Sequence, residues 1–459
     1  MAGYAFSREP RDVEPVATEY RNIATPIPAP GTADLLTRLD VAESRSMHGQ
    51  LPIAWDRAEN FSVYDSAGNR WIDFTSAIFV TNVGHANPRL ANALKQALDD
   101  QLVHSYAYAT EVRARYIERL IKFVPGELDK AFLVSTGTEA TETALKLMRL
   151  AGSQRGKRRL GVLCIEGSFH GQTYAAQLMS GRTNPAWVRG DNLEIFRLPF
   201  PYPWALRNCS GAEFFAESVS NLKQNGIDPT RDLAGFLLET FQGWGAVFYP
   251  PDYVSAVAAF CTNNSIVFGF DEMQAGFART GRRFGFEHYG VDPDLICCGK
   301  GMGSGYPLAG VIGRAALLDL PEVGAMSSTH SANPLACVAG LATIDEIETR
   351  DLVRGALDKG QTLLRALNEL QKRHPDHIEW CFGKGLVAAI LFRGTCNGAS
   401  ASEFTSRVVE RCMQKGVLVV HTGRESIKLG PPLTIPEDAL LEGVAVLDEA
   451  IGDVAARHA

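Results

Sequence analysis

The chain has 459 residues, of which 46% are apolar and 21% charged, and its 45 basic and 52 acidic residues leave a net charge of −7. These proportions are those of an ordinary soluble globular protein, so they exclude a disordered chain, a collagen and a coiled coil. The acidic balance also makes a nucleic acid or a membrane surface an unexpected partner.

The nine cysteines show no paired CxxC spacing, and the first ten residues, MAGYAFSREP, contain no apolar stretch. Reduced thiols and a cytoplasmic location are therefore expected, without a signal peptide. No metal site is expected either, because His374 and His377 lack further ligands at metal spacing.

The N-terminal part of the chain is polar and rich in proline. Residues 1–50 predict an irregular segment that crosses a surface. Two strand-like runs flank the turn-forming residues Asp65–Asn69 and predict a hairpin within 61–75. We expect the N-terminal segment and hairpin, residues 1–84, to associate with the C-terminal domain.

Residues 85–335 alternate short apolar runs with helical stretches, which predicts a large domain of the α/β class. The runs are continuously apolar, as in strands of a parallel sheet that is buried on both faces. A doubly wound, mostly parallel sheet is therefore expected. The predicted strands are 131–135, 161–166, 233–239, 265–270, 294–298 and 308–312.

Residues 336–459 predict a smaller α+β domain. Helical periodicity and apolar runs alternate here, without the regular strand–helix order of the preceding part. The predicted helices lie near 336–374, 402–415 and 437–456, and the predicted strands are 386–392 and 417–421.

Three motifs follow predicted strands. Residues 135–140 (STGTEA) open a helix whose free N–H groups suit a phosphate, although the same residues suit an ordinary helix cap. Phe169 and His170 follow the next strand, where an aromatic ring can stack on a planar ligand or simply join the core. Residues 239–245 (ETFQGWG) offer hydrogen-bonding groups and space for a ligand, or form a plain turn.

Two further residues carry the strongest chemical signals. Asp271 directly follows an apolar strand, where a carboxylate needs a partner such as a protonated ring nitrogen. Lys300 lies among small residues at another strand end, where desolvation lowers the pKa of a lysine and leaves an amine that can form a Schiff base. Together with a phosphate site and a stacking ring, these residues indicate pyridoxal 5′-phosphate (PLP).

From about residue 50 to about residue 450, the chain resembles the class III, or ω-type, PLP-dependent aminotransferases of fold type I. The matching stretches include STGTEATETALK, FHG, ETFQGWG, DEMQAGFARTG, GKGMGSGYPLAG, THSANPLAC and PPLTIPED. The DE-Q-G-RTG and GK segments are the most specific. The resemblance implies a mostly parallel central sheet in a large PLP-binding domain and a smaller α+β domain.

The resemblance also implies a role for each matching residue. Lys300 is implied to form the Schiff base, Asp271 to pair with the pyridine nitrogen and Gln242 to lie near the phenolic oxygen of the cofactor. Thr329 resembles a threonine that reaches the phosphate of the neighbouring subunit, which implies a homodimer with shared active sites. The implied cofactor contacts are Gly137, Thr138, Phe169, His170, Gln242, Asp271, Lys300 and Thr329.

The substrate side departs from the family pattern. Glu239 matches a glutamate beside the substrate pocket, but Trp244 stands where glutamate-using members carry a second glutamate. Lys428 stands where those members carry an arginine that binds a carboxylate, and Arg424 is a second cation nearby in the sequence. A lysine offers a point charge instead of a bidentate fork. Because Trp244 stands in place of a glutamate, it suggests a bulky or less acidic substrate, such as an ω-amine, a diamine or an amino sugar.

These residues predict an aminotransferase that moves an amino group from an amine or amino acid, including an ω-amine, to a keto acid such as pyruvate or 2-oxoglutarate. In this scheme the released Lys300 amine carries the Cα proton. The same residues also suit a PLP-dependent racemase, epimerase or aminomutase. The sequence leaves open the donor, the acceptor and the stereochemistry.

Overall fold

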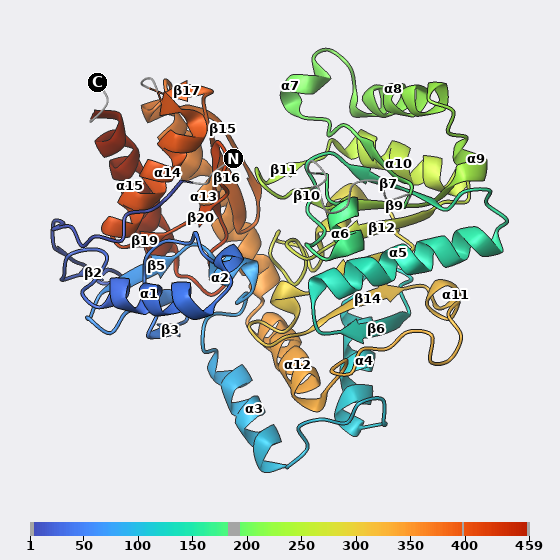
Figure 1. Ribbon diagram of the computed structural model, residues 1–459, viewed down its shortest axis with the longest axis horizontal. Coiled ribbons are helices and arrows are strands. Elements are labelled where there is room, and N and C mark those ends of the chain that lie inside the picture. The colour runs from blue at the N-terminus through green and yellow to red at the C-terminus, as the bar shows by residue number, and fades with distance from the viewer. Residues whose placement is uncertain (1–3, 182–192, 397–398, 457–459) are drawn as a thin grey trace. The chain divides into compact units, whose positions relative to one another are not determined.

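The computed structural model describes residues 4–181, 193–396 and 399–456. The chain divides into two compact units. Figure 1 colours the chain by residue number from the N-terminus to the C-terminus. The large unit comprises Pro88–Gly243 and Val247–Val353, and the terminal unit comprises Met1–Asn87, Trp244–Ala246 and Arg354–Ala459.

A seven-stranded sheet forms the centre of the large unit (Figure 1). Strand β14 runs antiparallel to both of its neighbours, β6 and β13, whereas the other neighbouring strands pair in parallel. In spatial order the strands are β6 (Lys130–Val134), β14 (Ala309–Gly313), β13 (Leu295–Cys298), β12 (Val267–Asp271), β9 (Leu233–Glu239), β7 (Gly161–Ile165) and β8 (Ile195–Leu198).

The six strands predicted for the large domain are all present in this sheet. Strands β9 and β12 are buried along their whole length, which explains their continuous apolar sequences. The sequence missed β8, whose four residues, IFRL, include the charged Arg197 and are too short for a periodic signal.

Helix α5 (Gly137–Gln154) crosses one face of this sheet and supplies much of the core (Figure 1). Its buried residues Leu147 and Met148 belong to one cluster with Leu237 and Val267 of the strands. Gly235 of β9 permits the close approach, because a Cβ atom there would lie 2.3 Å from the sulfur of Met148. This close contact sets the distance between the sheet and α5, the helix that begins at the predicted phosphate site.

Helix α12 (Pro334–Thr349) belongs to the large unit, whereas the sequence predicted the domain boundary at its start, between residues 335 and 336. It packs with α3 (Pro88–Asp99) and α4 (Glu111–Phe123). Its small side chains explain this placement, because Ala339 and Ala342 form a cluster with Leu90 of α3.

The terminal unit joins the two ends of the chain in one sheet. Strand β19 from the C-terminal half pairs in parallel with β5 from the N-terminal half, and the indole nitrogen of Trp71 donates to the carbonyl of Met413 at 2.8 Å. The predicted hairpin is formed by β4 and β5. The strands are β1 (Val16–Ala17), β2 (Asn22–Ile23), β5 (Arg70–Asp73), β4 (Ser62–Tyr64), β3 (Arg57–Glu59) and β19 (Val417–Leu418).

A second sheet of the terminal unit contains four strands in the order β15, β16, β21 and β20. The strand predicted at 417–421 is divided, since β19 joins the first sheet and β20 the second. Helix α1 (Thr32–Ala42) occupies part of the leader that was predicted to be irregular. Other elements of this unit include β15 (Ile378–Lys384), β16 (Val387–Phe392), β21 (Ser426–Leu429), β20 (Val420–His421), α13 (Leu352–Arg373), α14 (Ala401–Gln414) and α15 (Glu437–Ala456).

Within the described ranges, no helix combines the length and apolar character needed to cross a lipid bilayer.

Candidate active site

The carboxyl ends of the parallel strands gather most of the predicted cofactor residues at one edge of the large sheet. In the ladder, Asp271 of β12 lies opposite both Glu239 of β9 and Cys297 of β13. This edge is where open α/β sheets bind ligands. The residues are Ser135 after β6, Phe169 and His170 after β7, Glu239 at the end of β9, Asp271 at the end of β12 and Lys300 after β13.

Lys300 is held in an uncommon backbone conformation at this edge. Its φ of 39° lies in the left-handed region, which is strained for a residue with a side chain. Desolvation lowers the pKa of its amine, while the charges of Asp271 and Glu239 act in the opposite direction and raise it. Desolvation is the larger effect, so the amine loses its proton more readily than an exposed lysine and is a better nucleophile.

Asp271 is buried and oriented by two contacts. Its Oδ2 lies 2.8 Å from Nδ1 of His170, and its Oδ1 accepts a hydrogen bond of 3.0 Å from the backbone nitrogen of Met273. The backbone nitrogen of His170 donates in turn to Oγ of Ser180 at 2.9 Å. Burial of a carboxylate is costly without a cationic or hydrogen-bonding partner, and His170 supplies one.

The start of α5 has the geometry of a capped helix and also that of an anion-binding site. Glu139 accepts from the backbone nitrogens of Ser135 at 3.0 Å and Thr136 at 2.8 Å, and Thr136 caps the nitrogen of Glu139 at 3.3 Å. The N–H groups of Gly137 and Thr138 belong to the first turn, where a helix provides no partner. They point along the positive end of the helix dipole, which suits a phosphate.

Glu239 fixes the position of Phe169 from the neighbouring strand. Its Oε2 accepts a hydrogen bond of 3.1 Å from the backbone nitrogen of Phe169. Gly243 passes close by, because a Cβ atom there would lie 2.7 Å from Oε1 of Glu239 and 2.9 Å from the amide nitrogen of Gln274. The sequence did not single out Gln274, although it lies three residues after Asp271 in the same motif.

Met273 is a second residue of that motif that the sequence reasoning missed. A Cβ atom on Gly137 would lie 2.8 Å from its sulfur, and a Cβ atom on Gly299 would lie 2.6 Å from it. Its side chain therefore fills the space between the start of α5 and the residue before Lys300. In the sequence, the position of Met273 two residues after Asp271 could have indicated that it belongs to the site.

Gln242 is fully buried and its amide group is oriented. The side-chain nitrogen donates to the carbonyl of Glu166 at 2.8 Å and to the hydroxyl of Tyr202 at 3.0 Å. This orientation leaves the side-chain oxygen of Gln242 as an acceptor. Its predicted place near the phenolic oxygen of a cofactor stays a prediction.

Several buried polar atoms at this edge have no hydrogen-bond partner within the described part of the chain, among them Oγ of Ser135, Oγ of Ser168, Nε2 of His170 and Oε1 of Gln242. Buried polar groups are nearly always satisfied, so these atoms indicate a polar ligand. They lie on three loops of the large unit, together with a desolvated amine and a carboxylate. This set of groups fits a planar heterocycle that carries an aldehyde and a phosphate.

Thr329 does not join this group. It is exposed on the segment before α12, where its carbonyl lies 3.0 Å from Nε2 of His104. Its predicted contact with the cofactor of a second subunit stays a prediction.

The predicted substrate residues Trp244 and Lys428 both lie in the terminal unit. The guanidinium carbon of Arg424 is 3.9 Å from the ring centre of Trp244, and Oγ of Ser426 donates to the carbonyl of Trp244 at 2.9 Å. Lys428 is buried on β21, with its Nζ 4.6 Å from the ring centre of Phe79. Each of the two cations thus rests on an aromatic ring, an interaction worth about 0.5–2 kcal/mol.

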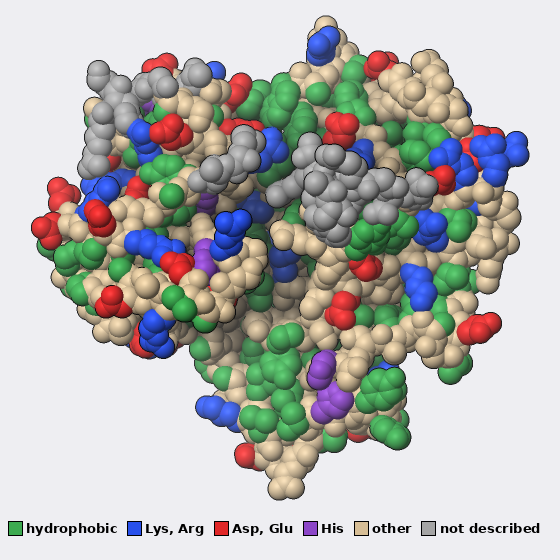
Figure 2. Space-filling model, in the orientation of Figure 1, with side chains coloured by type: hydrophobic (Ala, Val, Ile, Leu, Met, Phe, Trp, Pro, Cys, Tyr) green, Lys and Arg blue, Asp and Glu red, His purple; other side chains and the backbone are tan. Residues whose placement is uncertain are grey.

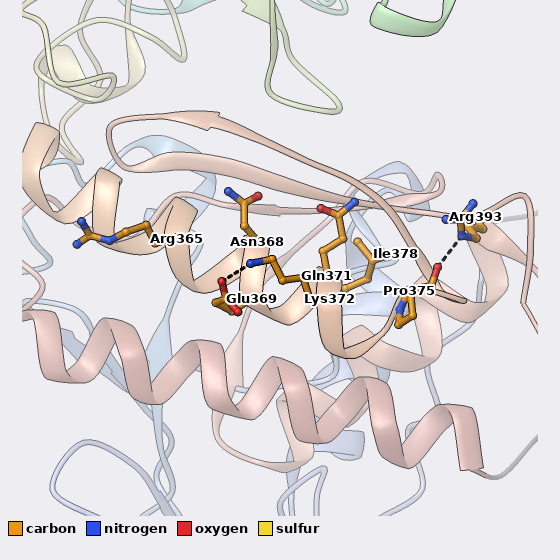
Figure 3. A pocket seen from close by; sticks show the side chains of 8 residues that line it. All are labelled: Arg365, Asn368, Glu369, Gln371, Lys372, Pro375, Ile378 and Arg393. Carbon is orange, nitrogen blue, oxygen red and sulfur yellow. Dashed lines mark hydrogen bonds and ion pairs between the residues drawn. The ribbon is translucent and has the colours of Figure 1, made fainter.

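A cavity of about 720 Å³ lies in the terminal unit beside α13 (Figure 3). Its polar groups are partly paired with one another, because Lys372 contacts Glu369 at 2.7 Å and Arg393 donates to the carbonyl of Pro375 at 2.8 Å. None of the residues that line it is a predicted catalytic or cofactor residue. The strand ends of the large unit therefore remain the candidate site.

Comparison with known proteins shows the family of the chain. The aminotransferase class-III family matches residues 44–451. A 4-aminobutyrate aminotransferase of Mycobacterium leprae is 33% identical over 95% of this chain and 99% of its own length. A 5-aminovalerate aminotransferase of Pseudomonas putida is 34% identical over 92% of this chain and 98% of its own length. Relatives named as aminotransferases do not favour the alternative of a racemase, epimerase or aminomutase.

The fold has solved counterparts. An (S)-enantioselective ω-transaminase from Thermomicrobium roseum has a TM-score of 0.82 and 27% sequence identity, over 92% of this chain and 98% of that chain. Its fold supports the expected fold type I architecture. The chain belongs to the class III aminotransferases, enzymes that move an amino group from an amine or amino acid to a keto acid.

Proposed function

We propose that this aminotransferase binds PLP at the strand ends of the large unit and that Lys300 is the lysine that bonds to it. The observation that carries the proposal is the desolvated Lys300 amine beside the carboxylates of Asp271 and Glu239. When bound, PLP supplies a ring that accepts electrons as the substrate loses its Cα proton.

The residues of the chain divide the remaining work. The first-turn N–H groups of Gly137 and Thr138 bind the phosphate, helped by the hydroxyl of Ser135. Asp271, oriented by His170, holds a proton on the ring nitrogen. The Nζ atom of Lys300 moves the proton of the substrate, and its lowered pKa favours the neutral form that this step needs.

The position of the ring depends on β7 and β9. Phe169 would hold the ring of the cofactor by stacking, and Glu239 fixes the backbone of Phe169 through the hydrogen bond of 3.1 Å. The side-chain oxygen of Gln242, which has no partner among the described residues, can accept a hydrogen bond at the same edge. This arrangement orients the cofactor before substrate arrives, which lowers the cost of reaching the reactive geometry.

The donor class follows from the relatives and from the terminal unit. The named relatives act on 4-aminobutyrate and 5-aminovalerate, so an ω-amine donor with a keto acid acceptor is the proposed substrate pair. Lys428 and Arg424 supply positive charge for a substrate carboxylate, and Trp244 replaces a negative side chain with an apolar ring. The location proposed for the enzyme is the cytoplasm, which rests on the cysteine pattern.

A homodimer is the proposed assembly. Exposed hydrophobic side chains on α3 and on the segment that follows it favour association, and Figure 2 shows such side chains over the α3 and α4 end of the large unit. Thr329 is exposed in the same unit, where it can contact a second subunit. The exposed residues are Leu98, Leu102, Val103, Tyr106 and Tyr108.

The substitution Lys300→Ala tests the proposal. We expect the PLP-loaded variant to lack the visible-region absorbance of the wild type and to lose transfer from a panel of ω-amines to pyruvate or 2-oxoglutarate by about 10⁴-fold or more. Lys372→Ala, at an exposed site on α13, is the control and should match the wild type in both. Full-rate transfer by Lys300→Ala would contradict the proposal.

A further inference from the structure

Glu272 is a buried carboxyl that the mechanism above does not use. It follows Asp271 directly, its side chain is 1% exposed, and three donors surround it. Its Oε1 accepts from the hydroxyl of Thr240 at 2.5 Å and from the backbone nitrogen of Phe286 at 2.8 Å. Its Oε2 accepts from the backbone nitrogen of Gly285 at 2.7 Å. Through these three contacts, Glu272 joins three segments of the chain.

The first pair of segments is β9 and β12. Glu239 and Asp271 lie opposite each other in the ladder, and they are the last residues of their strands. Thr240 and Glu272 are the next residues, and the bond between their side chains continues the pairing one step beyond the ladder. The carboxylate of Glu272 thus fixes the register of the two strand ends that carry Glu239 and Asp271.

The third segment is the short helix η3 (Gly285–Tyr289). It can approach because residue 285 is a glycine, since a Cβ atom there would lie 2.5 Å from Cγ2 of Thr240. The hydroxyl of Tyr289 donates to the carbonyl of Thr240 at 2.5 Å. Thr240 is therefore held from two sides, by Glu272 through its side chain and by Tyr289 through its backbone.

We propose that Glu272 is a positioning residue for the transfer reaction, whose carboxylate keeps Glu239 and Asp271 beside the Lys300 amine by clamping Thr240 and η3. The inference rests on the proposed role of Lys300 and PLP. Asp271 and Glu239 are the two charges that raise the pKa of Lys300. Loosening the clamp moves these charges relative to the amine and so changes the pH at which the amine titrates.

The electrostatics of Glu272 agree with this role. Burial raises the pKa of its carboxyl to about 7, the nearby charge of Asp271 adds to this, and the hydrogen bonds from Thr240, Gly285 and Phe286 oppose it. The other titratable groups that face it are Cys298 of β13 and Tyr289 of η3, and Glu272 contributes to raising the pKa of both. The three hydrogen bonds offset the free-energy cost of burying this carboxyl group, so the loss of any one of them destabilises its position.

Two substitutions at Thr240 give a matched test. Thr240→Val removes the donor at nearly constant size, whereas Thr240→Ser keeps the hydroxyl, and Glu272→Gln removes the charge itself. We expect the midpoint pH of the visible absorbance change of the PLP-loaded protein to fall by about half a unit in Thr240→Val and Glu272→Gln. Thr240→Ser should return to the value of the wild type.

Hydrogen exchange of the protein without PLP provides a readout that is independent of the cofactor. The amides of Gly285 and Phe286 should exchange about tenfold faster in Glu272→Gln than in the wild type, because both donate to this carboxylate. If Glu272→Gln does not fold, the two Thr240 variants decide the question through the absorbance midpoint.

The outcomes separate the inference from the proposed function. If the wild type has a pH-dependent absorbance band but the variants have the same midpoint pH or unchanged amide exchange, the positioning role alone is overturned. A wild type that shows no absorbance band with PLP would overturn the proposed function and the positioning role that rests on it.

Discussion

At the scale of single residues, the site depends on how Lys300 and Asp271 are held. Lys300 has a desolvated amine and a left-handed backbone, and Asp271 is fixed by His170 and by the backbone of Met273. A charged group that is held by its neighbours needs no rearrangement when charge develops in a reaction. The two residues therefore place an amine and a carboxylate at adjacent strand ends before substrate arrives.

Lys428 allows a test of substrate recognition. Lys428→Met keeps the length of the side chain and removes the charge, so we expect KM for a keto acid to rise about tenfold with a small change in kcat. Lys428→Arg is the charge-preserving control, and it should stay close to the wild type. Steady-state kinetics with 2-oxoglutarate and pyruvate measure both values. An unchanged KM in Lys428→Met would remove this residue from substrate binding.

The sequence yields a prediction for a single residue where a motif fixes the chemistry of that residue. Lys300 and Asp271 follow apolar strands, and their types alone suggest a ligand. The role of Glu272 could not be predicted from the sequence, because its partner Thr240 is 32 positions away and is brought close only by the register of the two strands. Gln242 was predicted as a contact, but the orientation of its amide depends on Tyr202, which the sequence does not connect to it.

At the scale of elements, the continuous apolar runs predicted the strands of the large sheet because burial on both faces leaves no other pattern. They could not predict that β14 runs antiparallel, since direction is not encoded in the hydropathy of one strand. The short strand β8 and the helix α1 were also missed. Elements of this kind depend on neighbours for their stability, so their own sequences carry a weak signal.

The contact of α5 with the sheet predicts a cost for adding one methyl group. Gly235→Ala should lower the free energy of unfolding by about 1–3 kcal/mol, because the new Cβ would lie 2.3 Å from the sulfur of buried Met148. Gly355→Ala in helix α13 is the control, since the nearest atom is 4.0 Å away. That change should stabilise the protein by about 0.5–1 kcal/mol. Denaturant unfolding of both variants measures the difference, and equal stabilities would contradict the packing argument.

At the scale of the whole molecule, Glu272 predicts a pH dependence of stability. The pKa of its carboxyl is about 7 in the folded chain, against 4.5 for a free glutamate side chain. A raised pKa means that the stability contributed by this group is complete below about pH 4.5 and is lost as the pH rises through about 7. The free energy of unfolding should therefore fall over this range less steeply in Glu272→Gln than in the wild type. Parallel curves would contradict the raised pKa.

The assembly can be tested by the mass of the protein in solution. Light scattering of the purified protein should give twice the mass of one chain. Val103→Asp, in the exposed hydrophobic group, should shift the protein towards the monomer, because a buried unpaired charge is costly at an interface. Val41→Asp, at an exposed site on α1, is the control. A monomeric wild type would overturn the proposed dimer.

The pairing of β5 with β19 has a consequence for synthesis on the ribosome. Chains emerge from the N-terminus, and domains generally fold as units during this process. Residues around Trp71 therefore leave the ribosome long before Met413 and Val417, to which they bind, have been made. The strands of the large unit, which end at Gly313, are complete much earlier. We expect the nascent chain to form the large sheet first. The N-terminal strand β5 of the terminal unit pairs with β19 only after the C-terminal part of the chain has been made.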